Sequence, residues 1–318
     1  MNVFSADLAL AITRLALLIS LGWFLARRGW VGPQERQPLM RIVVWVFFPA
    51  MILSRVSNNP LISSGPKALL YVGAGFLMII VGFLVATAVG TLFGVKAGVA
   101  RRSFAFSAGI NNFGYLGIPV TAALFNHDVV GVLLVHNVGV EAAIWTVGVA
   151  MVSGDSLARG LRNLLQPMTV ALFVALTLNL AGLGGTMPVR FLADLCHNIG
   201  ECAIPIGTLL TGVYLHENIG QFRMLADASA SFGVMAVRWV VMPLALLGVA
   251  GCFITDDSLR RVILVQAAMP CGIFTFLIVG LYKGDVQVSL RCSVITMLCC
   301  PLVTPLWLYV GSRWLGLG

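Results

Sequence analysis

Long apolar stretches, separated by short polar segments, cover the whole chain. Ten of them are long enough to cross the hydrocarbon core of a bilayer as helices, which takes roughly 17 to 25 residues each. In chain order they lie at residues 6–26, 37–56, 67–94, 102–125, 129–151, 167–184, 191–215, 229–252, 260–282 and 286–310. This pattern predicts an all-α polytopic membrane protein, with five spans before a polar connector at residues 153–166 and five after it.

The fourth stretch is apolar, yet it is unsuited to an unbroken helix. Asn111 and Asn112 place two carboxamides in its middle, Gly114 and Gly117 weaken the helix, and Pro119 removes a backbone donor. An unpaired peptide group in lipid costs several kcal/mol, so a break survives only where protein or a water-filled cavity pairs the freed groups. We therefore predict a broken helix here, with a binding site beside the break.

The ninth stretch shows the same features. It opens on Arg260 and Arg261, as the fourth opens on Arg101 and Arg102, and Met-Pro-Cys-Gly at residues 269–272 interrupts it. Interrupted hydrophobic segments at corresponding places in two halves are typical of transporters with inverted repeats and a binding site near the membrane midplane.

An odd number of spans in each half makes the second half enter the membrane from the opposite side. The expected organisation is therefore a first five-helix repeat at residues 1–152, a cytoplasmic connector at 153–166 and a second, inverted five-helix repeat at 167–318.

Composition and charge agree with a membrane protein. The 318 residues are 59% hydrophobic and only 10% charged, whereas soluble domains carry about 25% charged residues. The net charge of +8 is spread over short loops, which excludes a nucleic-acid partner and indicates topology signals instead. Twelve of the twenty Lys and Arg residues fall on one side of the predicted spans and six on the other. This bias predicts a cell (inner) membrane protein with both termini outside the cytoplasm.

Residues 111–119, Asn-Asn-Phe-Gly-Tyr-Leu-Gly-Ile-Pro, resemble the Asn-x-Gly-x-x-Gly-x-Pro signature of the auxin efflux carrier family. Ala-Met-Pro at 268–270 is similar to the matching break in that family's ninth span. Bacterial members include malonate carriers and other organic-acid permeases. The resemblance implies that spans four and nine cross in a mobile transport domain, while spans one, two, six and seven form a scaffold. Bile-acid symporters and sodium/proton antiporters share related architectures.

The resemblance also implies substrate contacts at the two breaks. The positions that match are Asn111, Asn112, Gly114, Gly117, Pro119, Met269 and Pro270. One departure concerns the second break, which plant carriers follow with Asn-Thr-Tyr. Here Cys-Gly-Ile-Phe-Thr follows, and Thr275 is its only side chain for hydrogen bonding, which puts auxin in doubt as the substrate.

Two charged residues lie inside predicted spans. Glu141 is near the middle of the fifth span and Arg238 is within the eighth. Ionisable groups at that depth usually face a partner or a water-filled path. Glu141 either pairs with an Arg of a neighbouring span or couples transport to protons, and Arg238 either holds an anionic substrate or pairs with Glu141.

A polar stripe on the seventh span offers a second site for proton coupling. Asp194, His197, Asn198 and Glu201 recur every three or four residues and so share one helical face. His197 and Glu201 are its candidate proton carriers. Without a third ligand at useful spacing the pair does not predict a metal site, and no cofactor is expected.

These features favour secondary active transport of a small organic anion, a mono- or dicarboxylate such as malonate or malate. Half-helix N-termini and asparagine carboxamides suit carboxylates. We expect elevator-type alternating access coupled to protons. A homodimer is compatible with the sequence.

One alternative to this function is a sodium-coupled symporter of the bile-acid type, although spans four and nine carry no acidic residue between their ends. The other is a membrane receptor or sensor without transport. The sequence contains no hydrolase elbow, zinc-protease motif or nucleotide loop, so an enzyme is not expected.

Overall fold

The computed structural model describes residues 6–62, 64–153, 167–219, 228–273 and 275–317. Every regular element within these ranges is a helix. They are α1 (Ala6–Arg27), α2 (Pro33–Ile42), η1 (Val43–Phe47), α3 (Phe48–Val56), α4 (Gly65–Leu92), α5 (Val99–Gly109), α6 (Gly117–Leu124), α7 (His127–Ala143), η2 (Ile144–Gly148), α8 (Val149–Ser153), α10 (Pro167–Leu180), η4 (Leu183–Gly185), α11 (Met187–Gly200), α12 (Ala203–Ile219), α13 (Ala228–Ala236), η6 (Val237–Val241), α14 (Met242–Phe253), α15 (Asp257–Ala267), α16 (Thr275–Leu281) and α17 (Val286–Leu315).

Five of the described helices are long and apolar enough to cross a membrane without interruption. They are Pro33–Val56, Gly65–Leu92, His127–Ser153, Ala228–Phe253 and Val286–Leu315. Three of them contain one π-helical segment each, namely η1, η2 and η6. All five coincide with predicted spans, which confirms a polytopic, all-helical membrane protein.

Short polar side chains set where several helices begin. Asn126, Asp256 and Asp285 accept hydrogen bonds from backbone N–H groups in the first turns of α7, α15 and α17, at distances of 3.2, 2.9 and 3.1 Å. Each bond satisfies a donor that has no partner inside the helix. Polar residues between the apolar stretches therefore position the helix ends.

The two predicted interruptions are present. α5 ends at Gly109 and α6 begins at Gly117, while α15 ends at Ala267 and α16 begins at Thr275. One predicted span differs, because residues 191–215 belong to two helices, α11 and α12, separated by a turn at Glu201 and Cys202. The ring of Pro205 conflicts with a helical carbonyl four residues earlier, at Glu201, which explains the turn. Of the predicted connector, residues 154–166 lie outside the described ranges.

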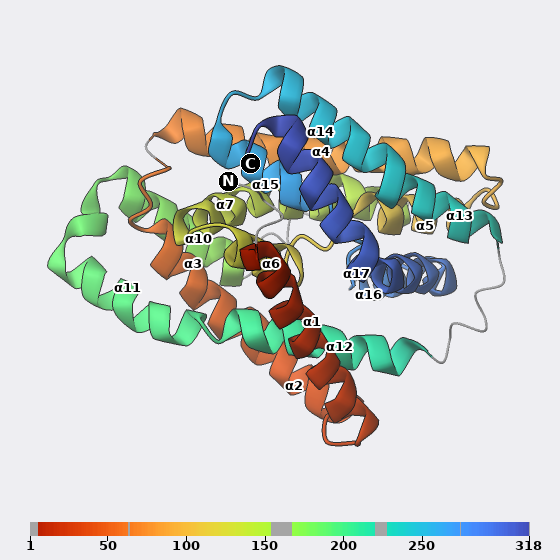
Figure 1. Ribbon diagram of the computed structural model, residues 1–318, viewed down its shortest axis with the longest axis horizontal. Helices are drawn as coiled ribbons and strands as arrows, with labels where there is room; N and C mark the ends of the chain where they lie inside the picture. Colours follow the sequence, from red (N-terminus) through yellow and green to blue (C-terminus); the bar gives the residue numbers. More distant parts are fainter. Residues whose placement is uncertain (1–5, 63, 154–166, 220–227, 274, 318) are drawn as a thin grey trace.

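The helices form two packed groups; in Figure 1 the first lies along the left and the bottom of the view, and the second across the top and the right. In the first group α1 packs against α12, and α3 packs against α10 and α11. In the second group α4 packs against α5 and α7, and α17 packs against α5, α13 and α16. The groups meet where α3 contacts α7 and where α1 contacts α6. Both interrupted helices belong to the second group.

Candidate functional site

The two helix breaks meet inside the second group. The backbone N–H of Asn112 donates to the carbonyl oxygen of Pro270 at 2.7 Å, and the N–H of Gly272 donates to the carbonyl oxygen of Ile110 at 2.9 Å. Asn111 and Cys271 thereby form an isolated antiparallel bridge. Each break supplies the partners that the other lost when its helix ended, which is what a break inside a membrane requires.

Hydroxyl groups on α17 pair further backbone groups of the second break. Their contacts are Thr304 Oγ1 to the carbonyl oxygen of Ala268 (2.7 Å), the N–H of Cys271 to Thr296 Oγ1 (3.0 Å) and Ser293 Oγ to the carbonyl oxygen of Gly272 (2.9 Å). These hydroxyl residues were not predicted from the sequence. A signal was present, because Ser289, Ser293, Thr296, Cys300 and Thr304 recur every three or four residues on one helical face.

Asn111 is held by a residue that the sequence analysis also missed. Its Nδ2 donates to the backbone carbonyl oxygen of Gln266 at 3.1 Å and to the side-chain oxygen of the same residue. Both side chains are buried, and Asn111 Oδ1 and Gln266 Nε2 have no hydrogen-bond partner among the residues that the structure describes. Gln266 is the single polar residue in the apolar run 262–269. A single polar residue in an apolar run was the signal from which a role for Gln266 could have been predicted.

A cavity of about 350 Å³ lies beside the meeting point of the breaks. Five predicted site residues line it: Asn111, Asn112, Gly114, Glu141 and Thr275. Met40, Val44 and Phe48 of the first group form the opposite wall. The cavity therefore lies between the two helix groups and touches both breaks. Most of its lining is apolar, and none of its described lining residues is basic.

Aromatic side chains bridge the cavity wall. Tyr115, which follows the first break, donates from its hydroxyl to the sulfur of Met40 at 3.0 Å, and its ring meets that of Phe48 edge-on at 5.9 Å. Glu141 acts electrostatically on Tyr115, and Trp145 lines the same cavity. Tyr115 thus links the break of the second group to helix Pro33–Val56 of the first.

The other predicted residues of the breaks lie behind the cavity. Gly117 and Pro119 are buried in the first turn of α6, and Met269 and Pro270 are buried within the second break. A Cβ on Gly117 would lie 3.1 Å from Gln266 Nε2. These four residues shape the break and are not among the residues that line the cavity.

Arg238 is buried in η6, with 1% of its surface exposed. Its Nη2 donates to the carbonyl oxygen of Met269 at 2.8 Å. Arg238 is not among the cavity-lining residues. The structure therefore places this cation behind the second break, where it holds a freed carbonyl group.

His197 and Glu201 lie in a separate polar cluster. Glu201 Oε1 is 3.7 Å from His197 Nδ1 and accepts a hydrogen bond from Arg55 Nη2. Arg55 Nη1 contacts His127 Nδ1. We call these four residues, Arg55, His127, His197 and Glu201, the Arg55 cluster. None of them lines the cavity at the breaks.

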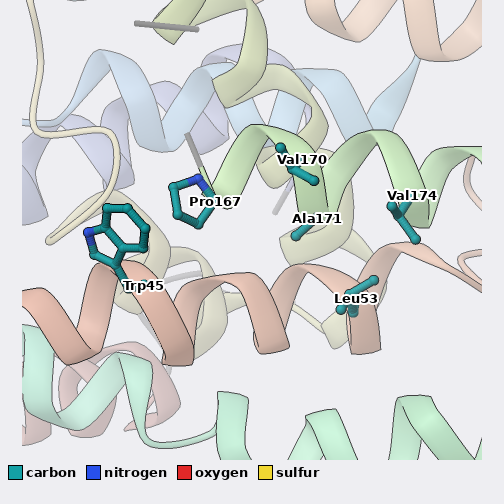
Figure 2. A pocket seen from close by; sticks show the side chains of 6 residues that line it. All are labelled: Trp45, Leu53, Pro167, Val170, Ala171 and Val174. Carbon is teal, nitrogen blue, oxygen red and sulfur yellow. The ribbon is translucent and has the colours of Figure 1, made fainter. Parts of the chain in front are cut away.

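Two other cavities have different linings. Figure 2 shows one of about 430 Å³ between helix Pro33–Val56 and α10, lined by Trp45, Leu53, Pro167, Val170, Ala171 and Val174. None of the described side chains in its lining carries a carboxylate, amide or hydroxyl group to orient a polar ligand. A further cavity, of about 450 Å³, lies among α1, α6, α12 and α17 and is also mainly apolar. The cavity at the breaks is therefore the candidate functional site.

A family model described as membrane transport protein matches the chain twice, over residues 9–159 and 156–308. The chain is also similar to an uncharacterized transporter of Methanothermobacter thermautotrophicus, with 22% identity over 298 residues, which cover 92% of this chain and 94% of the relative.

Two Arabidopsis thaliana proteins match shorter regions. PIN-LIKES 1 is 30% identical over 149 residues, which cover 42% of this chain and 30% of that protein. PIN-LIKES 3 is 29% identical over 122 residues, which cover 35% of this chain and 31% of that protein.

Proposed function

The chain belongs to the membrane transport protein family, the family of the auxin efflux carriers, and on this basis we propose that it carries a small organic anion across the cell membrane. Mono- and dicarboxylates such as malonate or malate are the proposed substrates. The chain is a multi-pass membrane transporter. Beyond this, we propose the class of substrate, coupling of transport to protons and an elevator-type mechanism.

The observation that carries the proposal is the position of the cavity. It touches both helix breaks on one side and helix Pro33–Val56 on the other. A substrate bound there would contact the interrupted helices of the second group on one side and would be covered by the first group on the other. Sliding of the second group along the first would carry that substrate across the membrane, with the first group as scaffold. Ten spans arranged as two inverted repeats would suit this movement.

The charges around the cavity support proton coupling. Glu141 lines it, and no described lining residue is Lys, Arg or His. A carboxylate substrate and an ionised Glu141 would repel each other in a poorly solvated site. One proton shared between them removes the repulsion. We therefore infer that substrate and proton bind together, with Asn111, Asn112 and Thr275 as hydrogen-bonding groups.

Sodium coupling is supported less well. Sodium sites at broken helices use unwound backbone carbonyl groups. Here the carbonyl oxygens of Ala268, Met269, Pro270 and Gly272 each accept a hydrogen bond from the protein. These four carbonyl oxygens of the second break therefore each have a protein partner already.

Transport by the purified protein in liposomes tests the proposal. A panel of labelled mono- and dicarboxylates is offered with an imposed pH gradient, an imposed sodium gradient, or neither. We expect at least one carboxylate to accumulate with the pH gradient and no response to sodium. Accumulation that follows sodium would contradict proton coupling. If every carboxylate fails while another solute is transported, the proposed substrate class is wrong.

A further inference from the structure

The Arg55 cluster lies near the C-terminal end of helix Pro33–Val56. The cavity is lined by Met40, Val44 and Phe48 of the same helix, and Arg55 follows Phe48 by about 10 Å along the helix axis. Arg55, His197 and Glu201 belong to the first helix group, whereas His127 opens α7 in the second. Contact between Arg55 and His127 therefore joins the two groups at a distance from the cavity.

The backbones of the two groups are also close at this place. Asn59 Nδ2 donates to the carbonyl oxygens of both Arg55 and Asp128, each at 3.0 Å. A Cβ on Gly131 would lie 2.7 Å from the carbonyl oxygen of Arg55. The glycine allows α7 to approach the end of α3 this closely. Any sliding of the groups must first separate these contacts.

The contact between Arg55 and His127 depends on the protonation state of the histidine. A guanidinium group only donates hydrogen bonds, so His127 Nδ1 must accept the bond from Arg55 Nη1. It can do so only in the neutral imidazole. Protonation places a hydrogen on Nδ1 and a positive charge directly against the guanidinium, and the contact is lost.

The neighbouring charges act on the same contact. The rings of His127 and His197 meet edge-on at 6.3 Å, and Glu201 lies between His197 and Arg55. Asp128 adjoins His127 in the chain. Charges of both signs therefore surround His127, with the Glu201 and Asp128 carboxylates and the Arg55 guanidinium nearby. A protonated His197 would compete with Arg55 for Glu201.

Arg55 cannot easily remain without its partners. It is buried, with 7% of its surface exposed, and its Nε has no hydrogen-bond partner within the described part of the chain. A buried donor that loses its acceptor is destabilised. Release of His127 leaves Nη1 without this acceptor, while Nη2 keeps Glu201, and so it favours a rearrangement that gives Nη1 access to water or to a new acceptor.

We propose that the Arg55 cluster is a proton-sensitive latch between the two helix groups. With neutral His127 the latch holds α3 against α7, and protonation of His127 opens it. The inference rests on the proposed movement of the second group along the first. It adds a point of control separate from Glu141 and the cavity.

Amide hydrogen exchange tests the latch without any substrate. Exchange of residues 51–59 and 127–135 is followed from about pH 7.5 to about pH 5.5, which spans the ordinary histidine pKa of about 6.5, and is corrected for intrinsic rates. In the parent protein we expect faster exchange in these segments as the pH falls, by up to about tenfold per pH unit because one proton is linked to opening. The exchange of residues 203–217 should not become faster as the pH falls.

Three variants complete the experiment. In His127→Gln a carboxamide oxygen can still accept from Arg55 and cannot be protonated, so we expect slow exchange at every pH. Arg55→Gln should exchange rapidly already at neutral pH. His216→Gln, whose histidine meets Trp23 at 5.1 Å, is the matched control and should behave as the parent.

Exchange in the parent that does not change with pH would overturn the latch, and this result needs no variant to fold. A pH response that persists in His127→Gln would also overturn it. Failure of the liposome assay with the expected exchange results would contradict the proposed function and leave the latch intact.

Discussion

The amide N–H of Asn112 lies 2.7 Å from the carbonyl oxygen of Pro270 and donates a hydrogen bond to it. This bond joins two helix breaks that are far apart in the chain, and it uses backbone atoms only. The side chain of Asn112 is therefore not needed to hold the crossing together. Its Nδ2 is buried without a hydrogen-bond partner in the described ranges, and the residue lines the cavity.

Replacement of Asn112 by Ala should weaken substrate binding without unfolding the protein. The lost hydrogen bond is worth about 0.5–1.5 kcal/mol, and roughly 1.5–3 kcal/mol if its partner is charged. For a carboxylate this corresponds to a loss of affinity of roughly tenfold or more. Titration calorimetry with the carboxylate that liposomes transport measures the affinity, and thermal unfolding in detergent measures stability.

Asn111→Ala is the matched variant for this experiment. Its side chain bonds Gln266 twice, so removal leaves buried amide groups unpaired, at a cost of about 1–3 kcal/mol. We expect this variant to lose stability, in contrast to Asn112→Ala. Unchanged affinity in Asn112→Ala would contradict a role for that side chain at the site.

Two glycines of the first break should respond differently to alanine. A Cβ on Gly117 would meet Gln266 Nε2 at 3.1 Å and the carbonyl oxygen of Asn112 at 3.2 Å, whereas a Cβ on Gly114 would meet no atom of the described residues within 4 Å. We expect Gly117→Ala to lower the unfolding temperature, because the buried amide must move.

Gly114→Ala is the control for that substitution. It should keep the parent's unfolding temperature and change only substrate affinity, since the methyl group enters the cavity. Thermal unfolding of both variants in detergent checks the contrast. Equal destabilisation of the two variants would show that the crossing is not packed as described.

Glu141→Gln should separate proton coupling from substrate movement. The glutamine imitates a permanently protonated carboxyl group, so the variant can bind a carboxylate but cannot release a proton. We expect substrate exchange across liposomes to continue while accumulation driven by a pH gradient is lost. Asp257→Asn, at an exposed helix start, is the control and should keep both activities. If Glu141→Gln retains the gradient dependence, His197 and Glu201 become the next residues to test.

Asp256 should make stability depend on pH in the acid range. Burial alone would raise its pKa, but bonds from the N–H of Leu259 (2.9 Å), from Lys67 (3.2 Å) and from the Tyr71 hydroxyl (3.2 Å) outweigh burial and lower that pKa. Its pKa is then lower in the folded than in the unfolded protein. The carboxylate thus stabilises the fold above its ordinary pKa of about 3.9, and this contribution is lost as the pH falls through the folded value.

The comparison with Asp256→Asn measures that contribution. At about pH 6, well above the ordinary aspartate pKa, the parent should unfold at a higher temperature than the variant. The difference should shrink as the pH approaches the folded pKa. A difference that is independent of pH would show that the ionised carboxylate is not what stabilises this helix start.

The two breaks could be predicted because their causes are local. Proline and glycine act on the helix within a few residues of their own position, so the interruptions near Asn111 and Pro270 were visible in the sequence. The resemblance of residues 111–119 to the auxin efflux carrier signature is likewise confirmed by the family match.

The location of Arg238 could not be predicted in the same way. The sequence shows a cation within a span, and it left two partners open, a substrate or Glu141. The structure places the guanidinium against the carbonyl oxygen of Met269. Which neighbour a buried charge meets depends on how separate helices pack, and hydrophobic periodicity carries no information on that.

The sequence by itself determined which segments are apolar enough for the membrane, where two helices break, and which family the chain resembles. These properties depend on hydrophobicity and backbone preferences within short windows. Only the tertiary structure decided which groups form hydrogen bonds with the unpaired peptide groups at the breaks. It also decided that a cavity lies between Glu141 and helix Pro33–Val56, and that Arg55 meets His127. Such contacts join residues far apart in the chain, because a polar group buried in a membrane protein must find its partner wherever helix packing places one.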